Sequence, residues 1–274
     1  MHSESHSGTG VRAVLFDVSG TTLDFGSRGP VAAFLELFER HGVTISIDEA
    51  RRPMGAHKKD HIRQVLADPG IAARWEGVHG QRPDEATVQD LFHEFVPLQT
   101  EVLPDYCDVI PGVPELVCEL RGRAIRIANT TGFDSTMMRD LVRLAAERGY
   151  SPDLWVTPDV AGGGRPAPWM AFYAARHLNV YPMDCIVKVG DTPVDVAEAH
   201  NAGMWAVSVV RHGNEVGLTE AELGALPEAE RQERIGIARR RLEACKPHYA
   251  IDNTADLLPV IDEISARLSR GERP

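Results

Sequence analysis

The chain has 274 residues, of which 43% are hydrophobic and 25% are charged, and this composition excludes a wholly disordered chain. Asp and Glu number 40 against 29 Lys and Arg, and the formal net charge of -11 without a basic run excludes general electrostatic binding to nucleic acid. A site for an anionic substrate must therefore be locally basic.

No apolar stretch is long enough to span a membrane, and residues 1–10 lack the apolar segment of a signal peptide, so we expect a disordered tail and no membrane partner. The four cysteines lie far apart without C-x-x-C spacing, which argues against a zinc site or a disulfide framework. We therefore expect a cytoplasmic protein with reduced thiols. The cysteines are Cys107, Cys118, Cys185 and Cys245.

Six short runs rich in Val, Ile and Ala predict β-strands, with helical stretches between them. Their apolarity is continuous rather than alternating, which is typical of a parallel sheet covered on both faces. The runs are 13–17, 124–129, 154–157, 185–191, 206–210 and 249–251. Helices are expected over 135–148 and 195–202, the second ending at Gly203. This order predicts a doubly wound, Rossmann-like α/β fold, in which ligands bind beyond the carboxyl ends of the strands.

Residues 29–104 lack convincing strands and predict a helical cap inserted after the first strand. Pro97 is expected to break or end the last cap helix, since proline lacks a backbone N–H and clashes with the preceding turn. The expected helices are 30–41, 49–67 and one that begins at 83–87 and runs towards Thr100.

The predicted organisation is a tail, a core in two segments and a cap. The ranges are 1–10 for the tail, 11–28 and 105–274 for the α/β core domain, and 29–104 for the helical cap domain. An insert in this place would lie over the strand ends as a lid, with hinges near 25–27 and 105–112.

Asp17 ends the first apolar run and precedes the turn 20–22, which contains two threonines. A carboxylate at a strand end beside hydroxyl groups is placed to attack phosphorus, although these residues could also form only a turn. Many phosphatases of this pattern carry an aspartate two residues later, which protonates the leaving oxygen. Ser19 stands there instead and is a poor general acid at neutral pH, so the leaving group either needs no acid or obtains one elsewhere, with Lys58 as the candidate.

Two further carboxylates, Asp191 and Asp195, follow the fourth predicted strand. Oxygen ligands of this kind suit Mg2+, and Asp191 is expected to bind the ion directly. Asp195 could hold a metal-bound water, or it could only favour the amino end of the next helix through the helix dipole.

Thr130, Thr131 and Gly132 follow the second predicted strand and offer hydroxyl and N–H donors to an anion, although turn formation also selects these residue types. Arg165 follows three glycines and could neutralise phosphoryl charge and orient Asp17, although a loop arginine is usually solvated surface. Together the two segments predict a phosphoryl-binding site.

Lys58 and Lys59 are neighbours in the predicted cap, but they cannot face the same way. On a helix Lys58 and His61 share a face, whereas Lys59 points roughly 100° away. His61 could therefore tune Lys58 or relay a proton to it. The alternative is a solvated basic helix face without a catalytic role.

With these elements assembled, the sequence resembles the haloacid dehalogenase superfamily and, within it, the phosphonatases, over nearly the whole chain. The superfamily motifs are Asp17-Val-Ser-Gly-Thr-Thr22, Thr130 with Thr131, Arg165 in place of the usual lysine, and Gly190-Asp-Thr-Pro-Val-Asp195. The motifs typical of phosphonatases are Ala50-Arg-Arg-Pro-Met-Gly-Ala-His-Lys58 with Asp60 and His61, Thr130-Thr-Gly132, Gly164-Arg-Pro-x-Pro-Trp-Met170 and Asn201-Ala-Gly-Met-Trp205.

The resemblance implies hydrolysis of the carbon–phosphorus bond of phosphonoacetaldehyde by a homodimer that assembles through the cap. It implies that Asp17 is the nucleophile and Lys58 the Schiff-base lysine. The expected Mg2+ ligands are Asp17, Asp191 and the backbone carbonyl of Ser19, with Asp195 in the outer metal shell. The expected substrate or phosphoryl contacts are Met54, His61, Thr130, Thr131 and Arg165. Members usually have alanine at Ser19, tyrosine at Phe133 and cysteine near Ser27.

This chemistry accounts for the residue pattern. Cleavage of the carbon–phosphorus bond would leave an unstable carbanion on acetaldehyde, whereas a protonated imine on Lys58 would accept the electrons as Asp17 attacks phosphorus. Because a lysine with its ordinary pKa of about 10.4 is protonated at neutral pH, Lys58 must be desolvated or lie near other cations. The alternatives are a phosphate-ester phosphatase or phosphomutase with a different acid, and a non-catalytic protein that binds a phosphorylated ligand.

Overall fold

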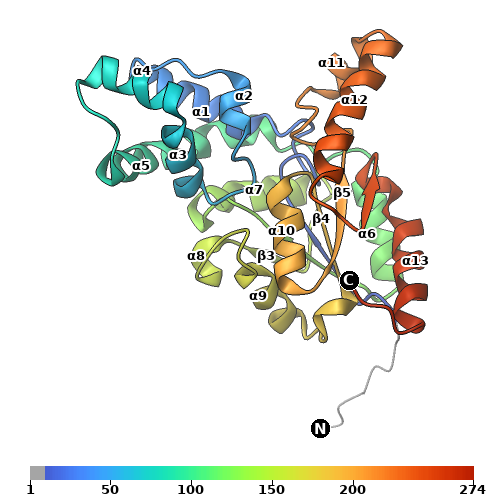
Figure 1. Cartoon of the computed structure of the whole chain (residues 1–274). Helices are drawn as coiled ribbons and strands as arrows, with labels where there is room; N and C mark the ends of the chain where they lie inside the picture. The colour runs from blue at the N-terminus through green and yellow to red at the C-terminus, as the bar shows by residue number, and fades with distance from the viewer. Residues whose placement is uncertain (1–9) are drawn as a thin grey trace.

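The computed structural model describes residues 10–274, so the tail expected over residues 1–10 lies outside the described part except for Gly10. Six parallel strands form one sheet in the order β3-β2-β1-β4-β5-β6, which confirms the doubly wound fold (Figure 1). The strands are β1 Ala13–Phe16, β2 Arg126–Thr130, β3 Leu154–Val156, β4 Ile186–Gly190, β5 Trp205–Val209 and β6 Tyr249–Ile251. At the centre, Ala13 pairs with Arg126 on one side and with Ile186 on the other.

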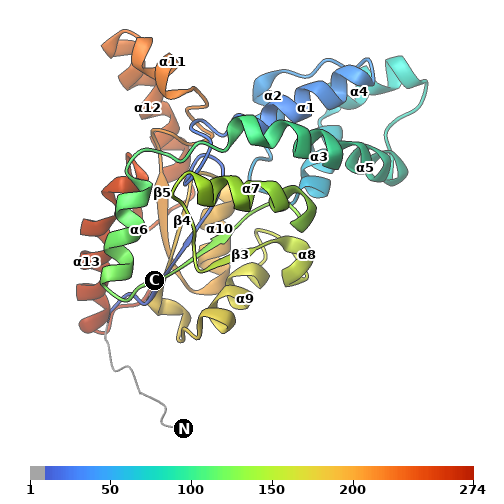
Figure 2. The ribbon, with the colours of Figure 1, turned by 180° about the vertical axis from the view of Figure 1, so that it is seen from behind.

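Helices cover both faces of this sheet. The main ones are α6 Val113–Gly122, α7 Ser135–Glu147, α9 Trp169–Leu178, α10 Pro193–Ala202 and α13 Leu257–Ser269. Successive residues of β1 point to opposite faces, so that Val14 and Phe16 enter one core cluster and Ala13 and Leu15 the other. α9 and α10 cover the face of Ala13, and α6, α7 and α13 cover the opposite face, as Figures 1 and 2 show.

Shorter or peripheral helices complete the core. They are α8 Pro158–Ala161, α11 Glu220–Ala225, α12 Glu228–Glu243 and the 3-10 helices Leu103–Tyr106, Met183–Cys185 and Thr254–Asp256. Within residues 10–274, no helix combines the length and the apolarity that crossing a membrane requires. All four cysteines are free thiols, as expected.

Five helices lie between β1 and the 3-10 helix Leu103–Tyr106 in the sequence, and they form a group at the end of the sheet where the strands end (Figure 1). They are α1 Gly29–Arg40, α2 Ile47–Arg51, α3 Lys58–Ala67, α4 Pro69–His79 and α5 Glu85–Val102. We call α1 to α5 the cap. Its core is aromatic: the rings of Phe34 and Phe95 lie 4.5 Å apart, and both belong to the same apolar cluster as Val14 of the sheet.

The single helix predicted over 49–67 is wrong, because α2 ends at Arg51 and α3 begins at Lys58. Pro53 has no N–H to donate within a helix, and Gly55 adopts a φ of 89°, which is outside helical geometry. The residues between the two helices form a turn, and we call residues 52–57 the cap turn.

Pro97 does not break or end the last cap helix, contrary to the prediction, because α5 continues to Val102. Pro97 is exposed, whereas Phe95, two residues before it, and Leu98, directly after it, are buried in the cap. The carbonyl of His93, which loses its helical partner at Pro97, belongs to an exposed residue and can bind water. Packing of the apolar face therefore outweighs the missing hydrogen bond.

We expect Phe95→Ala to lower the free energy of unfolding by about 3–5 kcal/mol, because it removes a fully buried ring from the aromatic centre of the cap. Val78→Ala, at a residue that is 54% exposed, should change it by less than about 0.5 kcal/mol. Chemical denaturation of both variants measures the difference. Equal stabilities would contradict the packing described for α1 and α5.

Candidate active site

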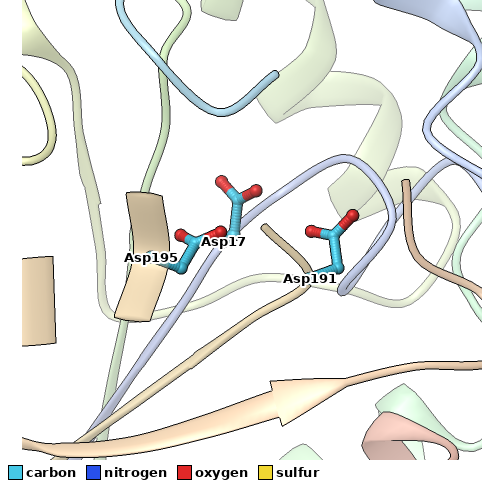
Figure 3. A group of neighbouring side chains, drawn as sticks. All are labelled: Asp17, Asp191 and Asp195. Carbon is cyan, nitrogen blue, oxygen red and sulfur yellow. The ribbon is translucent and has the colours of Figure 1, made fainter. Parts of the chain in front are cut away.

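Three aspartates from separate segments meet at the carboxyl ends of the strands. Asp17 follows β1, Asp191 follows β4, and Asp195 lies in the first turn of α10. One carboxylate oxygen of each lies within 4.8 Å of the others, and Figure 3 shows the three side chains next to one another. All three residues are buried. The parallel sheet therefore brings together carboxylates that are distant in the sequence.

The loop after β1 folds against Asp191. The hydroxyl of Thr21 donates a hydrogen bond to this carboxylate at 2.9 Å. Gly20 has a φ of 80°, and a β-carbon there would lie 2.3 Å from a carboxylate oxygen of Asp191, so a side chain would displace the loop or the aspartate. Ser19 is half-buried in the same loop, with no ionisable group to serve as an acid.

Asp195 also fixes the start of α10. Its carboxylate accepts hydrogen bonds from the hydroxyl and the backbone N–H of Thr192, and Pro193 occupies the first turn. The helix ends at Gly203 with a φ of 69°, which confirms the predicted cap. The capping role of Asp195 therefore does not exclude a role for this residue in the charged cluster.

Arg165 is fully buried and binds two of the three aspartates. Its guanidinium lies 2.5 Å from the carboxylate of Asp17 and 2.6 Å from that of Asp195, and it donates to the Thr130 carbonyl at 2.7 Å. Burial lowers the pKa of Arg165, but the charges of Asp17 and Asp195 raise it above its ordinary value. A permanent cation is thus fixed beside Asp17.

Two further charged residues join this cluster. Lys188 of β4 lies 3.1 Å from the carboxylates of both Asp195 and Glu198, and both Lys188 and Glu198 are buried. The hydroxyl of Thr130 bonds to the same pair, at 2.6 Å from Lys188 and 3.2 Å from Glu198. Lys188 and Glu198 are not among the site residues predicted from the sequence, although a lone lysine in an apolar strand is a signal for a buried ion pair.

Thr130 and Thr131 have different surroundings, although the sequence suggests equivalent roles. The hydroxyl of Thr130 is engaged beneath the aspartates, in the network with Lys188 and Glu198. Thr131 lies one residue beyond β2, and its hydroxyl accepts only the N–H of Phe133 at 3.2 Å among the described residues. Its proton is therefore free to be donated to an oxygen at the strand ends.

The buried cluster contains more negative than positive groups. Its four carboxylates face two cations, which leaves an excess of negative charge inside the protein. Burial, together with the charges of Asp17 and Asp195, raises the pKa of Asp191 well above its ordinary value. A divalent cation would relieve this repulsion, and oxygen donors are the ligands that Mg2+ prefers. The residues present therefore fit a metal ion.

Asp195 differs from Asp191 in its electrostatic surroundings. Burial raises its pKa, but the charges of Arg165 and Lys188 outweigh this effect, and the pKa of Asp195 is lowered. Asp195 is thus already neutralised by protein cations, whereas among the described residues Asp191 accepts hydrogen bonds only from neutral groups, the hydroxyl of Thr21 and the N–H of Asn214. A bound cation would therefore stabilise the ionised form of Asp191 more than that of Asp195.

The cap turn contacts the strand-end loops through its backbone. A β-carbon on Gly55 would lie 2.4 Å from the hydroxyl oxygen of Thr192, and one on Gly132 would lie 2.3 Å from the carbonyl oxygen of Ala56. Such close approach needs glycine on both sides of the contact. The turn therefore packs against the strand-end loops and brings the start of α3 next to them.

Lys58, the first residue of α3, is only 3% exposed. Its Nζ lies 3.9 Å from the sulfur of Met54 and 4.9 Å from the ring centroid of Phe133. Among residues 10–274, no carboxylate lies within ion-pair distance of this amine. Burial lowers the pKa of Lys58 to about 8, against the attraction of Asp17 and with the help of the Arg165 charge.

The two neighbouring lysines face different ways, as helical geometry predicts. Lys59 is partly exposed and forms an ion pair with Glu85 at 3.2 Å and a hydrogen bond with Gln89 at 2.6 Å. Lys58 and His61 share the buried face of α3. The buried amine is therefore that of Lys58.

His61 is buried and stacks on Phe34, with ring centroids 3.9 Å apart. Its Nε2 lies 2.8 Å from the carbonyl oxygen of Ala50, an acceptor, which places the ring proton on this nitrogen. Burial and the Lys58 charge lower the pKa of His61 well below its ordinary value, so the ring is neutral. No described hydrogen bond joins His61 to Lys58, and a direct proton relay between them is not present in this structure.

Comparisons with known proteins agree with this architecture. Residues 11–203 match the family model of haloacid dehalogenase-like hydrolases. The phosphonoacetaldehyde hydrolase of Nitratidesulfovibrio vulgaris is 44% identical over 96% of this chain and 94% of its own length, and that of Bacillus cytotoxicus is 45% identical over 93% and 96%. A crystal structure of a phosphonoacetaldehyde hydrolase-like protein from Oleispira antarctica superposes with a TM-score of 0.95 at 38% identity, over 100% of this chain and 99% of that one.

The matches include the cap as well as the α/β core, since they span nearly all of each chain. The fold, the buried acidic cluster and the sequence matches lead to one assignment. The chain belongs to the phosphonoacetaldehyde hydrolase family, within the haloacid dehalogenase-like hydrolases.

Proposed function

We propose that this hydrolase cleaves the carbon–phosphorus bond of phosphonoacetaldehyde and releases acetaldehyde and phosphate. The observation that carries the proposal is the buried amine of Lys58, which has no carboxylate partner in residues 10–274 and lies close enough to Asp17 and Arg165 for their charges to act on its pKa. Relatives that are 44% and 45% identical bear the name of this activity. An ester phosphatase with the usual general acid would carry an aspartate at position 19, where this chain has a serine.

In the proposed reaction, the Lys58 amine condenses with the aldehyde to form a protonated imine and releases one water. The Asp17 carboxylate attacks phosphorus as the carbon–phosphorus bond breaks, and the electron pair of that bond moves into the imine to give an enamine. One water hydrolyses the aspartyl phosphate to phosphate. Protonation of the enamine at carbon and addition of a second water release acetaldehyde and restore Lys58. The net reaction consumes one water.

Burial makes the first step feasible near neutral pH. With a pKa of about 8, about one-tenth of the Lys58 amines are unprotonated at pH 7, compared with a far smaller fraction for an exposed lysine. The contacts with Met54 and Phe133 supply an apolar surface and no competing carboxylate. We assign His61 to holding α3 against α2 through the Ala50 carbonyl, rather than to proton transfer.

Groups around Asp17 offset the charge of the phosphoryl oxygens. We assign this role to the Arg165 guanidinium, which is already oriented by Asp17 and Asp195, and to the free hydroxyl proton of Thr131. Thr130 would act indirectly, since its carbonyl holds Arg165 and its hydroxyl is engaged with Lys188.

We infer that Mg2+ is the cation of the acidic cluster. Asp17, Asp191 and the backbone carbonyl of Ser19 would hold it, and Asp195 would lie outside the direct ligands because Arg165 and Lys188 already bind its carboxylate. When bound, the ion would stabilise negative charge on the phosphoryl oxygens.

Borohydride added with phosphonoacetaldehyde should reduce the imine and leave a two-carbon fragment on Lys58, detectable by peptide mass. Lys58→Arg should abolish both labelling and turnover, because a guanidinium does not form the imine. Lys59→Arg is the matched control and should keep both, since Lys59 is paired with Glu85 on the outer face. Labelling of Lys59, or full turnover in Lys58→Arg, would refute the proposal, and activity on simple phosphate esters alone would favour the phosphatase alternative.

The pH dependence of kcat/KM should reflect the amine of Lys58 in the free enzyme. Because its lowered pKa lets the amine lose its proton earlier as pH rises, kcat/KM should increase about tenfold from pH 6 to pH 7 and level off above pH 8. A rise that continues unchanged towards pH 10 would mean that burial does not activate this lysine.

Asp191→Asn should weaken Mg2+ binding by roughly 100-fold or more, because the variant loses the carboxylate that protein cations leave uncompensated. Asp140→Asn, at an exposed position on α7, is the control and should bind as the unaltered protein does. Isothermal titration with MgCl2 measures both. Unchanged affinity in Asp191→Asn would place the ion elsewhere.

A further inference from the structure

Arg51, the last residue of α2, joins the cap to two other segments. Its Nη1 donates to the carbonyl of Gly26 at 2.9 Å and to the side-chain amide oxygen of Asn214 at 2.9 Å, and its Nη2 donates to the carbonyl of Gly217 at 3.2 Å. Gly26 lies in the connection between β1 and the cap. Asn214 and Gly217 lie in the loop after β5, and we call residues 212–218 the β5 loop.

The site for this guanidinium is built from neutral oxygens. Among the described residues Arg51 forms no ion pair, and the carbonyl of Asn214 is a further acceptor at 3.2 Å. A planar guanidinium can bridge several acceptors at once, whereas an ammonium group cannot reproduce this fork. The β5 loop passes so close that a β-carbon on Gly217, whose φ is 67°, would lie 2.8 Å from the guanidinium carbon of Arg51.

The β5 loop contacts the acidic cluster on its other side. The backbone N–H of Asn214, the residue that Arg51 binds, donates to a carboxylate oxygen of Asp191 at 2.7 Å. A β-carbon on Gly213 would lie 2.6 Å from that of Asp191, so the loop is packed tightly on this aspartate. A single residue therefore separates the cap arginine from the carboxylate expected to bind the metal.

On the cap side, Arg51 immediately precedes the cap turn, which leads directly to Lys58. Fixing the guanidinium of Arg51 therefore fixes the start of the cap turn, which leads to the amine of Lys58. The same side chain holds the connection at Gly26, where a hinge is expected from the sequence. The same set of hydrogen bonds therefore holds the cap against the core and holds the β5 loop that contacts Asp191.

We propose that Arg51 is a positioning residue that couples closure of the cap to the orientation of Asp191, by bridging the connection at Gly26 and the β5 loop. The inference rests on the proposed function for the roles of Lys58 and Asp191, but the bridge itself does not depend on the substrate. When the bridge breaks, the Asn214 N–H is released from Asp191, and the cap turn loses its anchor next to the core.

The test compares Arg51→Ala with Arg52→Ala, its neighbour. Arg52 is exposed and pairs with Asp68 within the cap, so it is a matched control for charge and position. In Arg51→Ala we expect faster amide hydrogen exchange in residues 25–28 and 212–218, and Mg2+ binding weakened by roughly 10-fold or more in calorimetric titration. Arg52→Ala should match the unaltered protein in both measurements.

Two further measurements separate positioning from a general loss of structure. Arg51→Lys keeps the charge but not the fork, so it should also show faster exchange and weaker Mg2+ binding. Free guanidinium ion at millimolar concentration should restore Mg2+ affinity and kcat/KM to Arg51→Ala but not to Asp191→Asn. If Arg51→Ala does not fold, Arg51→Lys alone tests the inference.

Wild-type exchange and Mg2+ affinity in both Arg51 variants would overturn the inference, as would an equal effect of Arg52→Ala. Its failure is distinguishable from failure of the proposed function. If the unaltered protein does not hydrolyse phosphonoacetaldehyde, the function is wrong, yet hydrogen exchange and MgCl2 titration still decide whether Arg51 couples the cap to Asp191.

Discussion

Burial of the Lys58 amine beyond ion-pair distance of every carboxylate in residues 10–274 is the constraint on which the rest of the site depends. A buried ammonium would normally acquire an ion pair, which would hold its proton and prevent reaction with an aldehyde. Here the nearest contacts are the sulfur of Met54 and the ring of Phe133. The carboxylates gather instead around Arg165 and Lys188, so acidic charge and reactive amine occupy separate parts of one crevice.

This separation depends on close contact between the cap and the α/β core. The α/β sheet supplies the acidic cluster at its strand ends, and the cap supplies the amine from the start of α3. Glycines at positions 55 and 132 let backbone approach backbone where a side chain would keep the two apart. The ring of Phe133, from the core, lies against the Lys58 amine, so contact between the cap and the core contributes to the burial that lowers the pKa of this amine.

The sheet could be predicted from the sequence because its strands are short continuous apolar runs, and all six were found within one or two residues of their observed bounds. The cap was harder. Helical periodicity continues through Pro53 and Gly55, where the backbone turns, and Pro97 is tolerated because Phe95 and Leu98 anchor α5 on its buried side. At Pro53 and Gly55 the local backbone preference determines the structure, whereas at Pro97 tertiary packing outweighs it.

The residues of the site divide in the same way, into those that a local motif identifies and those that depend on tertiary contacts. Asp17, Asp191 and Arg165 could be identified because each follows a strand or a glycine loop in a recognisable motif. Lys188 in its apolar strand signals a buried ion pair, but its partner Glu198 could not be identified, since no local pattern encodes the contact between β4 and α10. The inequivalence of Thr130 and Thr131 likewise depends on which hydroxyl the buried lysine reaches.

The central claim is that burial, helped by the Arg165 charge, lowers the pKa of Lys58 enough to make its amine a nucleophile near neutral pH. The most direct measurement is an NMR titration of the Lys58 side chain, with carbon-13 at Cε, in the substrate-free protein. We predict a pKa of about 8, and an unshifted pKa, equal to that of an exposed lysine, would contradict the role of burial.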